Sequence, residues 1–167
     1  MKTLITLAIL SLLHNYCKAQ SENQSIQYLS RLNYTDCNLT PFTWEDGSHK
    51  ISFATGNNKL TNYFIENISN KRRLFFYGRI GIQILLNNQG KSCCKSIYLK
   101  DGKVVLEDFK LLNLDSIINT MPNWTIKKPA LADSNGGNYC LILEVEFYGD
   151  GNISVTYDPY ARRKFIN

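Results

Sequence analysis

The residues that could perform acid–base or nucleophilic chemistry are few. Glu144 and Glu146 are separated by one residue, so on a β-strand both carboxylates lie on one face, as a paired-carboxylate hydrolase would require. Cys93 and Cys94 could supply a thiolate, but His49 is the only histidine beyond the apolar N-terminus that could serve as a base. No third group is placed by a motif to orient it. We therefore expect solvent-facing carboxylates and no catalytic residue.

Metal, cofactor and anion sites have little support in the sequence. His49 has no second histidine at ligand spacing, and the cysteines do not form spaced Cys-x-x-Cys pairs. The pair Gly136-Gly137 lacks the strand, spacing and helix of a phosphate loop. The basic run Lys71-Arg72-Arg73 is interpreted as a solvated connection into a strand rather than as a contact surface. We expect neither a metal nor a cofactor.

The N-terminus has the pattern of a secretory leader. Lys2 precedes an apolar run from Leu4 to Leu13, and small and polar residues then favour cleavage after Ala19. The run is shorter than the roughly 20 residues that a membrane-spanning helix needs, so we expect export without a stable membrane anchor. Removal of residues 1–19 takes away two lysines and no acid, which lowers the formal charge from +5 to +3. Such a mild excess argues against nucleic acid as the partner.

Four cysteines remain after cleavage, and an oxidising compartment would allow three ways of pairing them. Neighbouring cysteines on a strand point to opposite faces, so Cys93 and Cys94 are not expected to bond to each other. One should face the core and the other solvent. The four are Cys37, Cys93, Cys94 and Cys140.

Six Asn-x-Ser/Thr sequences occur, which would matter only in a eukaryotic secretory pathway. Asn123 precedes Trp124, an expected core residue, which favours a chance origin for that site. The asparagines are Asn23, Asn33, Asn38, Asn67, Asn123 and Asn152.

The periodicity of apolar residues predicts the elements that would position these groups. Residues 20–50 are polar and irregular, although Cys37, Phe42 and Trp44 suggest that part of this segment docks on the domain. Residues 58–68 have helical spacing. The alternation from Ile80 to Leu86 predicts a strand with one buried face.

The second half of the chain continues this pattern. The turn at 87–90 leads into a partner strand at 91–99, and a helix over 111–118 is stopped by Pro122. Residues 139–148 then alternate between apolar and mostly polar side chains, which predicts a strand. The glycines at 149–151 allow a hairpin into 153–157.

These motifs resemble the C-terminal domain of TonB-type energy transducers. The resemblance rests on the glycine-led strand from Gly78, the Asn-Asn-Gln-Gly turn, the following helix and Met121-Pro122-Asn123-Trp124, and on the helix that ends in Glu66-Asn67-Ile68. It implies an α+β domain with a small, mainly antiparallel sheet and two helices. The expected divisions are a signal peptide at 1–19, a polar segment at 20–50, the TonB-like domain at 51–148 and a hairpin or tail at 149–167.

The resemblance also implies a function without catalysis. In that family the final strand lies at the sheet edge and pairs with an extended segment of an outer-membrane receptor, a mode called strand addition. We therefore expect an exported, periplasmic or extracellular protein that binds a peptide or envelope protein, and the resemblance implies a link to TonB-dependent transport. If residues 153–157 fold back on the strand, that edge is already occupied. The residues expected to bind the partner are Tyr139, Leu141, Ile142, Glu144, Glu146 and Tyr148.

Two other classes of function stay open. The first is a secreted, disulfide-bonded glycoprotein whose similarity to the TonB pattern is accidental. The second is an exported enzyme whose catalytic residue would come from Glu144, Glu146, Cys93, Cys94 or His49. The sequence leaves the oligomeric state open.

Overall fold

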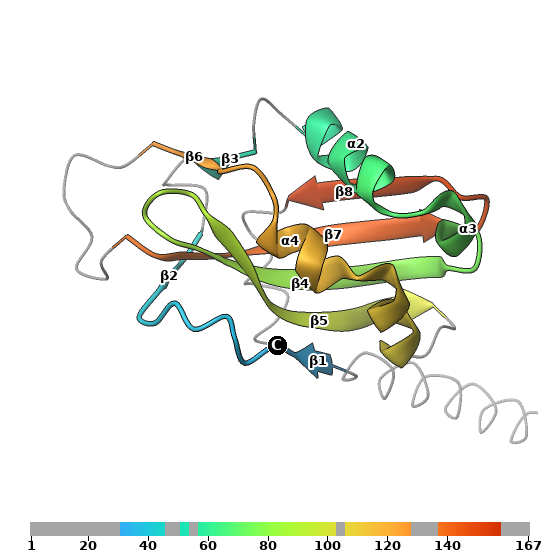
Figure 1. The fold of residues 1–167 in the computed structure, drawn as a ribbon, viewed down its shortest axis with the longest axis horizontal. Coiled ribbons are helices and arrows are strands. Elements are labelled where there is room, and N and C mark those ends of the chain that lie inside the picture. The colour runs from blue at the N-terminus through green and yellow to red at the C-terminus, as the bar shows by residue number, and fades with distance from the viewer. Residues whose placement is uncertain (1–30, 46–50, 54–56, 103–105, 128–136, 158–167) are drawn as a thin grey trace, which may run out of the picture.

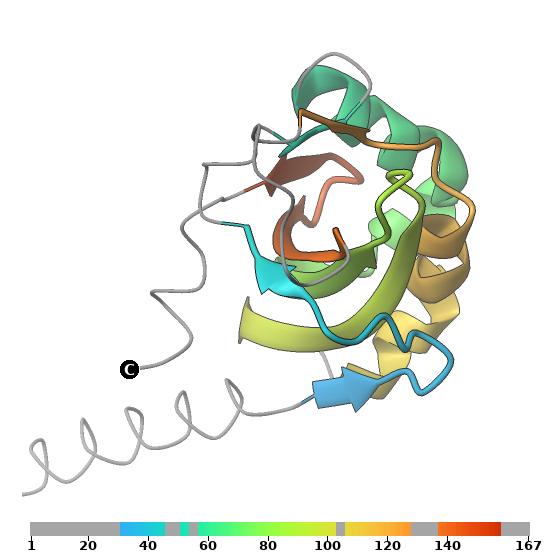
Figure 2. The ribbon, with the colours of Figure 1, turned by 90° about the vertical axis from the view of Figure 1, so that its left-hand side faces the viewer.

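Figure 1 shows the computed structural model, which describes residues 31–45, 51–53, 57–102, 106–127 and 137–157. The fold is α+β, with a mainly antiparallel sheet that is curved and carries its helices on one face (Figure 2). Within the described ranges, no helix has the length and apolar character needed to cross a membrane. The expected leader at 1–19, His49 and Asn23 lie outside the described residues.

Six strands form the main sheet in the order β1-β5-β4-β7-β2, and β8 also pairs with β7. All neighbours in it are antiparallel except β2, which runs parallel to the start of β7. The strands are β1 (Arg31–Asn33), β2 (Thr43–Trp44), β4 (Tyr77–Leu86), β5 (Ser92–Gly102), β7 (Tyr139–Tyr148) and β8 (Ile153–Tyr157). A separate pair is formed by β3 (Ile51–Ser52) and β6 (Thr125–Ile126).

The helices and one face of the sheet enclose the hydrophobic core. Alternate residues from Ile80 to Leu86 are buried on this face, as the strand period predicted, and Trp124 is buried in the same core. The predicted hairpin is confirmed, and so is the helix predicted over 58–68. The helical elements are α2 (Asn57–Asn67), α3 (Asn70–Arg73), the 3-10 helix η1 (Leu106–Leu112) and α4 (Leu114–Asn119).

The helix count differs from the two that were expected, because residues 70–73 form the short helix α3. Arg73 explains why this segment is not a solvated connection. Its side chain is buried, and its Nη1 donates hydrogen bonds to the carbonyl oxygens of Ile65 and Ile68, at the end of α2. A cation satisfies the last carbonyl groups of a helix and is favoured by the helix dipole. Lys71 and Arg72 are exposed, although Arg72 donates a hydrogen bond to the carbonyl oxygen of Leu111. The interpretation of the run as a solvated connection is wrong for Arg73.

The opposite face of the sheet, here called the back face, is half covered by residues 34–45. Cys37 packs against Leu85 and Cys140, and Trp44 packs against Tyr98 and Ile142. This contact confirms that part of the polar segment docks on the domain. The covering segment also contributes β2, so the sheet extends beyond the expected unit at 51–148.

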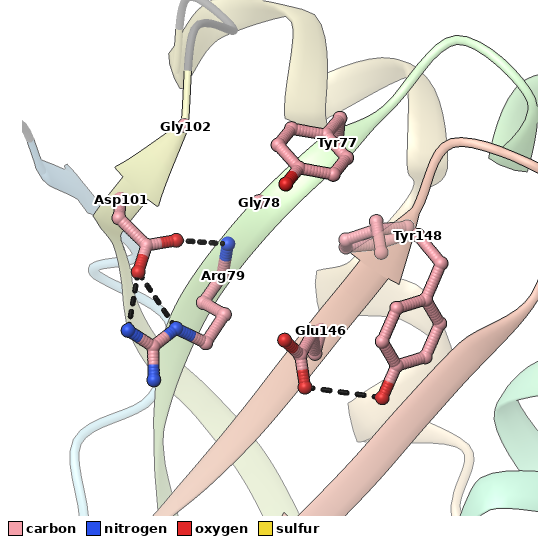
Figure 3. A pocket seen from close by; sticks show the side chains of 8 residues that line it. Tyr77, Gly78, Arg79, Asp101, Gly102, Glu146 and Tyr148 are labelled. Carbon is pink, nitrogen blue, oxygen red and sulfur yellow. Dashed lines mark hydrogen bonds and ion pairs between the residues drawn. The ribbon is translucent and has the colours of Figure 1, made fainter.

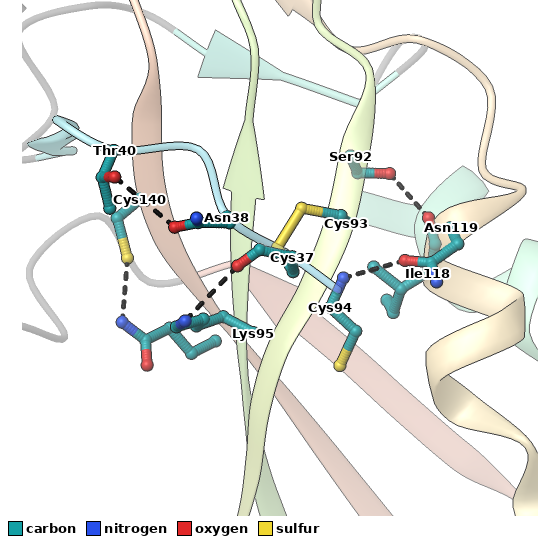
Figure 4. Close-up of a disulfide and its surroundings, with 11 residues drawn as sticks. Cys37, Asn38, Thr40, Ser92, Cys93, Cys94, Lys95, Ile118, Asn119 and Cys140 are labelled. Carbon is teal, nitrogen blue, oxygen red and sulfur yellow. Dashed lines mark hydrogen bonds between the residues drawn. A yellow bond between two sulfur atoms is a disulfide. The ribbon is translucent and has the colours of Figure 1, made fainter. Parts of the chain in front are cut away.

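A disulfide fastens the covering segment to the sheet. The Sγ atoms of Cys37 and Cys93 are 2.01 Å apart (Figure 4). Cys94 points to the other face and is buried in the main core, so the prediction that neighbouring cysteines face opposite sides is confirmed. Cys93 does not face open solvent, however, because it is bonded to the segment that covers it.

The prediction that residues 139–148 form an edge strand is wrong. Strand β7 pairs with β4 along its whole length, from Tyr139 opposite Leu86 to Tyr148 opposite Tyr77. Its other side pairs with β2 at residues 139–140 and with β8 at residues 143–147. The hairpin at 149–151 does fold back, so β7 lies inside the sheet.

The outer edge of β8 is itself protected by helix α2. The hydroxyl of Thr61 accepts a hydrogen bond from the amide N–H of Val155 at 3.0 Å and donates one to its carbonyl oxygen at 3.2 Å. One side chain thus occupies both outward backbone groups of the central residue of β8. Covering an edge in this way prevents pairing with another strand.

Candidate functional site

The half of the back face that residues 34–45 leave uncovered contains a hollow of about 330 Å³. Figure 3 shows Tyr77 and Tyr148 on neighbouring strands, with Arg79 bonded to Asp101 on one side and Glu146 bonded to Tyr148 on the other. We call this feature the tyrosine hollow. Its lining residues are Tyr77, Gly78, Arg79, Asp101, Gly102, Glu146, Phe147 and Tyr148.

The strand register brings these side chains together. Tyr77 is directly opposite Tyr148 in the β4–β7 pair, and Arg79 is directly opposite Glu146. On the other side of β4, Arg79 is opposite Asp101 of β5. Side chains two residues apart on a strand share a face, and opposed residues are close enough to interact.

Two glycines allow β4 and β5 to approach closely beneath the hollow. Gly78 and Gly102 are opposed, with φ angles of +124° and +120°. A Cβ atom added to Gly78 would lie 2.4 Å from the carbonyl oxygen of Asp101. No other residue type fits here without a backbone shift, because the φ angle is strained for L side chains and the contact is with main chain. The glycines thus leave a floor without side chains.

An ion-pair network occupies one side of the hollow. The Nε of Arg79 donates to Oδ2 of Asp101 at 2.7 Å, and the Arg79 backbone N–H donates to Oδ1 at 2.9 Å. Glu144 accepts a hydrogen bond from Lys100 and lies 3.5 Å from Nη1 of Arg79. The hydrogen bond and charge of Asp101 raise the pKa of Arg79, so this guanidinium is held in its charged form.

Glu146 and Tyr148 form a second polar unit. The phenol of Tyr148 donates a hydrogen bond to Oε2 of Glu146 at 3.1 Å. This bond to a carboxylate raises the pKa of Tyr148, so the phenol stays protonated and fixes the acid. The rings remain accessible, because Tyr77 is 69% exposed and Tyr148 is 47% exposed.

The structure separates the six residues that were expected to bind a partner. Tyr139 and Leu141 are buried in the main core, and Ile142 is buried under Trp44. Glu144, Glu146 and Tyr148 share the open half of the back face with the hollow, as the alternation predicted. The expectation of a single binding edge along 139–148 is therefore corrected to a surface role for these three side chains.

Sequence reasoning missed Tyr77, Arg79 and Asp101. The alternation that buries Ile80 already places Tyr77 and Arg79 on the opposite face, so this part of the signal was present. The position of Asp101 depends on register shifts that bulge β5 beside Arg79 and Gln83. Apolar periodicity carries no information about such bulges.

The cysteines offer no nucleophile in this state. Cys37 and Cys93 are joined, while burial raises the pKa of Cys94 and of Cys140 to about 12. A thiol with so high a pKa is protonated at neutral pH and unreactive. Among the described residues, no group of three His, Cys, Asp or Glu side chains is arranged to hold a metal ion.

Comparisons with protein-family models, with curated proteins and with solved structures gave no match. The fold itself defines the class of the protein, which is an α+β domain with a mainly antiparallel sheet.

Proposed function

We propose that the chain is an exported, non-catalytic binding protein that holds a protein or peptide against the open half of its back face. This keeps the function implied by the TonB resemblance and changes the mode of contact. The partner meets the side chains of Tyr77, Tyr148 and Glu146 rather than the backbone edge of β7.

Strand pairing is the reason for this change. Addition of a partner strand along 139–148 would require β8 and β2 to leave β7, because both flank its outer side. The next edge outward, β8, is capped by Thr61. A face-on contact needs no such rearrangement.

The observation that carries the proposal is the pair of accessible tyrosines that line the hollow. Large aromatic side chains with a polar tip supply much contact area at a small loss of conformational freedom, and they are enriched at protein interfaces. Tyr77 and Tyr148 meet this description and come from two strands of the rigid sheet. The hollow between them accepts a projecting side chain of the partner.

Export and the link to TonB-type proteins are parts of the same proposal. The disulfide between Cys37 and Cys93 is typical of an oxidising compartment such as the periplasm. The order of α2, the β4–β5 hairpin, α4 and β7 agrees with the order of helix, hairpin, helix and strand in the resemblance. A role in TonB-dependent transport rests on the sequence motifs.

Site-specific photo-crosslinking tests the binding surface. A photoreactive phenylalanine analogue replaces Tyr77 or Tyr148 in the chain expressed by its own host. Matched control positions are Ile65 and Leu111, two exposed apolar residues outside the back face. We expect one defined adduct from positions 77 and 148 that is absent from both controls.

The adduct also identifies the partner by mass spectrometry. A discrete envelope protein would support the periplasmic role. Equal adducts from all four positions, or none from 77 and 148 in a chain of native circular dichroism, would refute the proposed surface.

A secreted glycoprotein is the second candidate, and one observation favours it. All five sequon asparagines within the described residues are exposed, including Asn123, whose neighbour Trp124 is buried. Burial of Trp124 therefore does not argue against a glycan on Asn123, contrary to the expectation from the sequence. The five are Asn33, Asn38, Asn67, Asn123 and Asn152.

Mass spectrometry of the chain purified from its own source separates the two candidates. Treatment with peptide N-glycosidase F would convert each glycosylated asparagine to aspartate. Conversion at several of the five sites would establish the glycoprotein, whereas five unmodified asparagines would exclude it.

A further inference from the structure

Around the tyrosine hollow, acidic side chains outnumber basic ones. Asp101 is held by Arg79 through two side-chain contacts, and Glu144 is held by Lys100. Within the described part of the chain, no lysine or arginine lies within ion-pair distance of Glu146. Its carboxylate accepts a hydrogen bond from the phenol of Tyr148. The charge of Glu146 also acts on Arg79, which lies opposite it on β4, but without a direct ion pair. Arg79 and Lys100 thus face the three carboxylates of Asp101, Glu144 and Glu146, which leaves one negative charge in excess.

The tyrosine rings favour the same sign of ligand. An aromatic face attracts a cation, and the attraction is stronger when a carboxylate lies close by and water is partly displaced. Tyr77 and Tyr148 line the hollow together with Glu146 (Figure 3). The guanidinium of Arg79, which could otherwise attract an anion, is already engaged with Asp101.

We propose that the tyrosine hollow binds a basic side chain, a guanidinium or an ammonium group, presented by a peptide segment of the partner. This inference rests on the proposed function and specifies the chemistry of its site. Glu146 supplies the counter-charge, and the Tyr148 hydroxyl orients that carboxylate. The volume of about 330 Å³ accommodates one long side chain and leaves the peptide backbone on the surface.

Titration of the ¹⁵N-labelled chain from Gln20 to Asn167, followed by NMR, tests this directly. The probes are the peptides acetyl-Gly-Ser-Arg-Gly-Ser-amide and the same peptide with citrulline, which has the shape of arginine without its charge. We expect saturable shifts at the amides of Tyr77, Glu146 and Tyr148 with the arginine peptide. At low salt the citrulline peptide should bind about ten-fold more weakly.

A matched pair of variants assigns the charge to its residue. Glu146→Gln keeps the shape and removes the charge, so the arginine peptide should lose about ten-fold in affinity and match the citrulline peptide. Glu66→Gln removes an exposed acid of α2 and should change neither peptide. The amide spectra of both variants should otherwise overlay that of the native chain.

Three results would overturn the cation site. They are equal binding of the two peptides, no saturable shift at Tyr77, Glu146 and Tyr148 with the arginine peptide, and a shift of these residues with a neutral sugar, chitotriose, where the arginine peptide gives none, because such a ligand carries no positive charge. The proposed function is judged separately, because crosslinking from positions 77 and 148 requires no charge on the ligand. An adduct that Glu146→Gln leaves unchanged would refute the cation site and retain the binding surface.

Discussion

At the scale of single residues, the thiols of Cys94 and Cys140 couple the stability of the fold to pH. Both are buried, and burial raises the pKa of each from 9.0 to about 12. In the unfolded chain the thiols regain their ordinary pKa and release protons at lower pH than in the folded chain. Their contribution is therefore complete below about pH 9 and is lost as the pH rises from about 9 towards 12.

The expected effect is a fall in the free energy of unfolding of about 1.4 kcal/mol per pH unit for each thiol above pH 9. Urea unfolding between pH 7.5 and 10.5 measures it. The double variant Cys94→Ala, Cys140→Ala should be less stable at neutral pH and should show a shallower decline with pH. Parallel declines in the two proteins would mean that the thiols do not contribute.

Residue patterns also show how far the sequence could predict the site. The alternation of Glu144, Glu146 and Tyr148 with buried residues correctly placed these three on one face. The same alternation included Ile142, which is covered by Trp44 from a segment more than 90 positions earlier in the chain. Local periodicity detects a face of a strand but not what covers it. The sequence allowed three disulfide pairings, so it did not determine where the segment at 34–45 crosses the sheet.

At the scale of elements, Thr61 of α2 decides whether β8 is a protected edge. Thr61→Val has nearly the same shape but leaves the amide and carbonyl of Val155 without the hydroxyl that serves both. The free energy of unfolding should fall by about 1–3 kcal/mol, because backbone groups without a hydrogen-bond partner still bear the cost of desolvation. Chemical denaturation measures this, and hydrogen exchange at the Val155 amide should become faster.

Thr61→Ser is the matched control, since it keeps the hydroxyl and removes a methyl group. It should lower the free energy of unfolding by less than the valine variant does, and it should keep the Val155 amide protected from hydrogen exchange. If serine and valine destabilise equally, packing of the methyl group rather than capping of the edge would explain the role of Thr61.

The status of β7 shows which element properties the sequence could reveal. Its existence and core face were predictable from the alternation, and so were the hairpin and the buried Trp124. Its interior position was not, because it depends on β8 folding back and on β2 joining in parallel from the N-terminal segment. Each strand in isolation has the same pattern at an edge or inside a sheet.

At the scale of the whole molecule, the disulfide determines how much of the back face is open. The covering segment makes contact through a few apolar side chains, and the strands β1, just before it, and β2, within it, contain three and two residues. These contacts are small beside the β4–β5–β7 framework. The bond between Cys37 and Cys93 closes a loop with a sequence separation of 56, so it restricts the unfolded chain as well as holding the segment in place.

The variant Cys37→Ala, Cys93→Ala should therefore lose about 4 kcal/mol of unfolding free energy, as expected for a loop of this length. Limited proteolysis should cleave it within 38–45 before the sheet unfolds, since the segment would then leave Leu85 and Ile142. The variant Cys140→Ala keeps the disulfide and serves as the control for loss of a buried sulfur. Unchanged proteolysis would show that apolar contacts alone hold the segment. Early cleavage with intact arginine-peptide binding would instead show that the tyrosine hollow is built by the sheet alone, because none of its lining residues belongs to the covering segment.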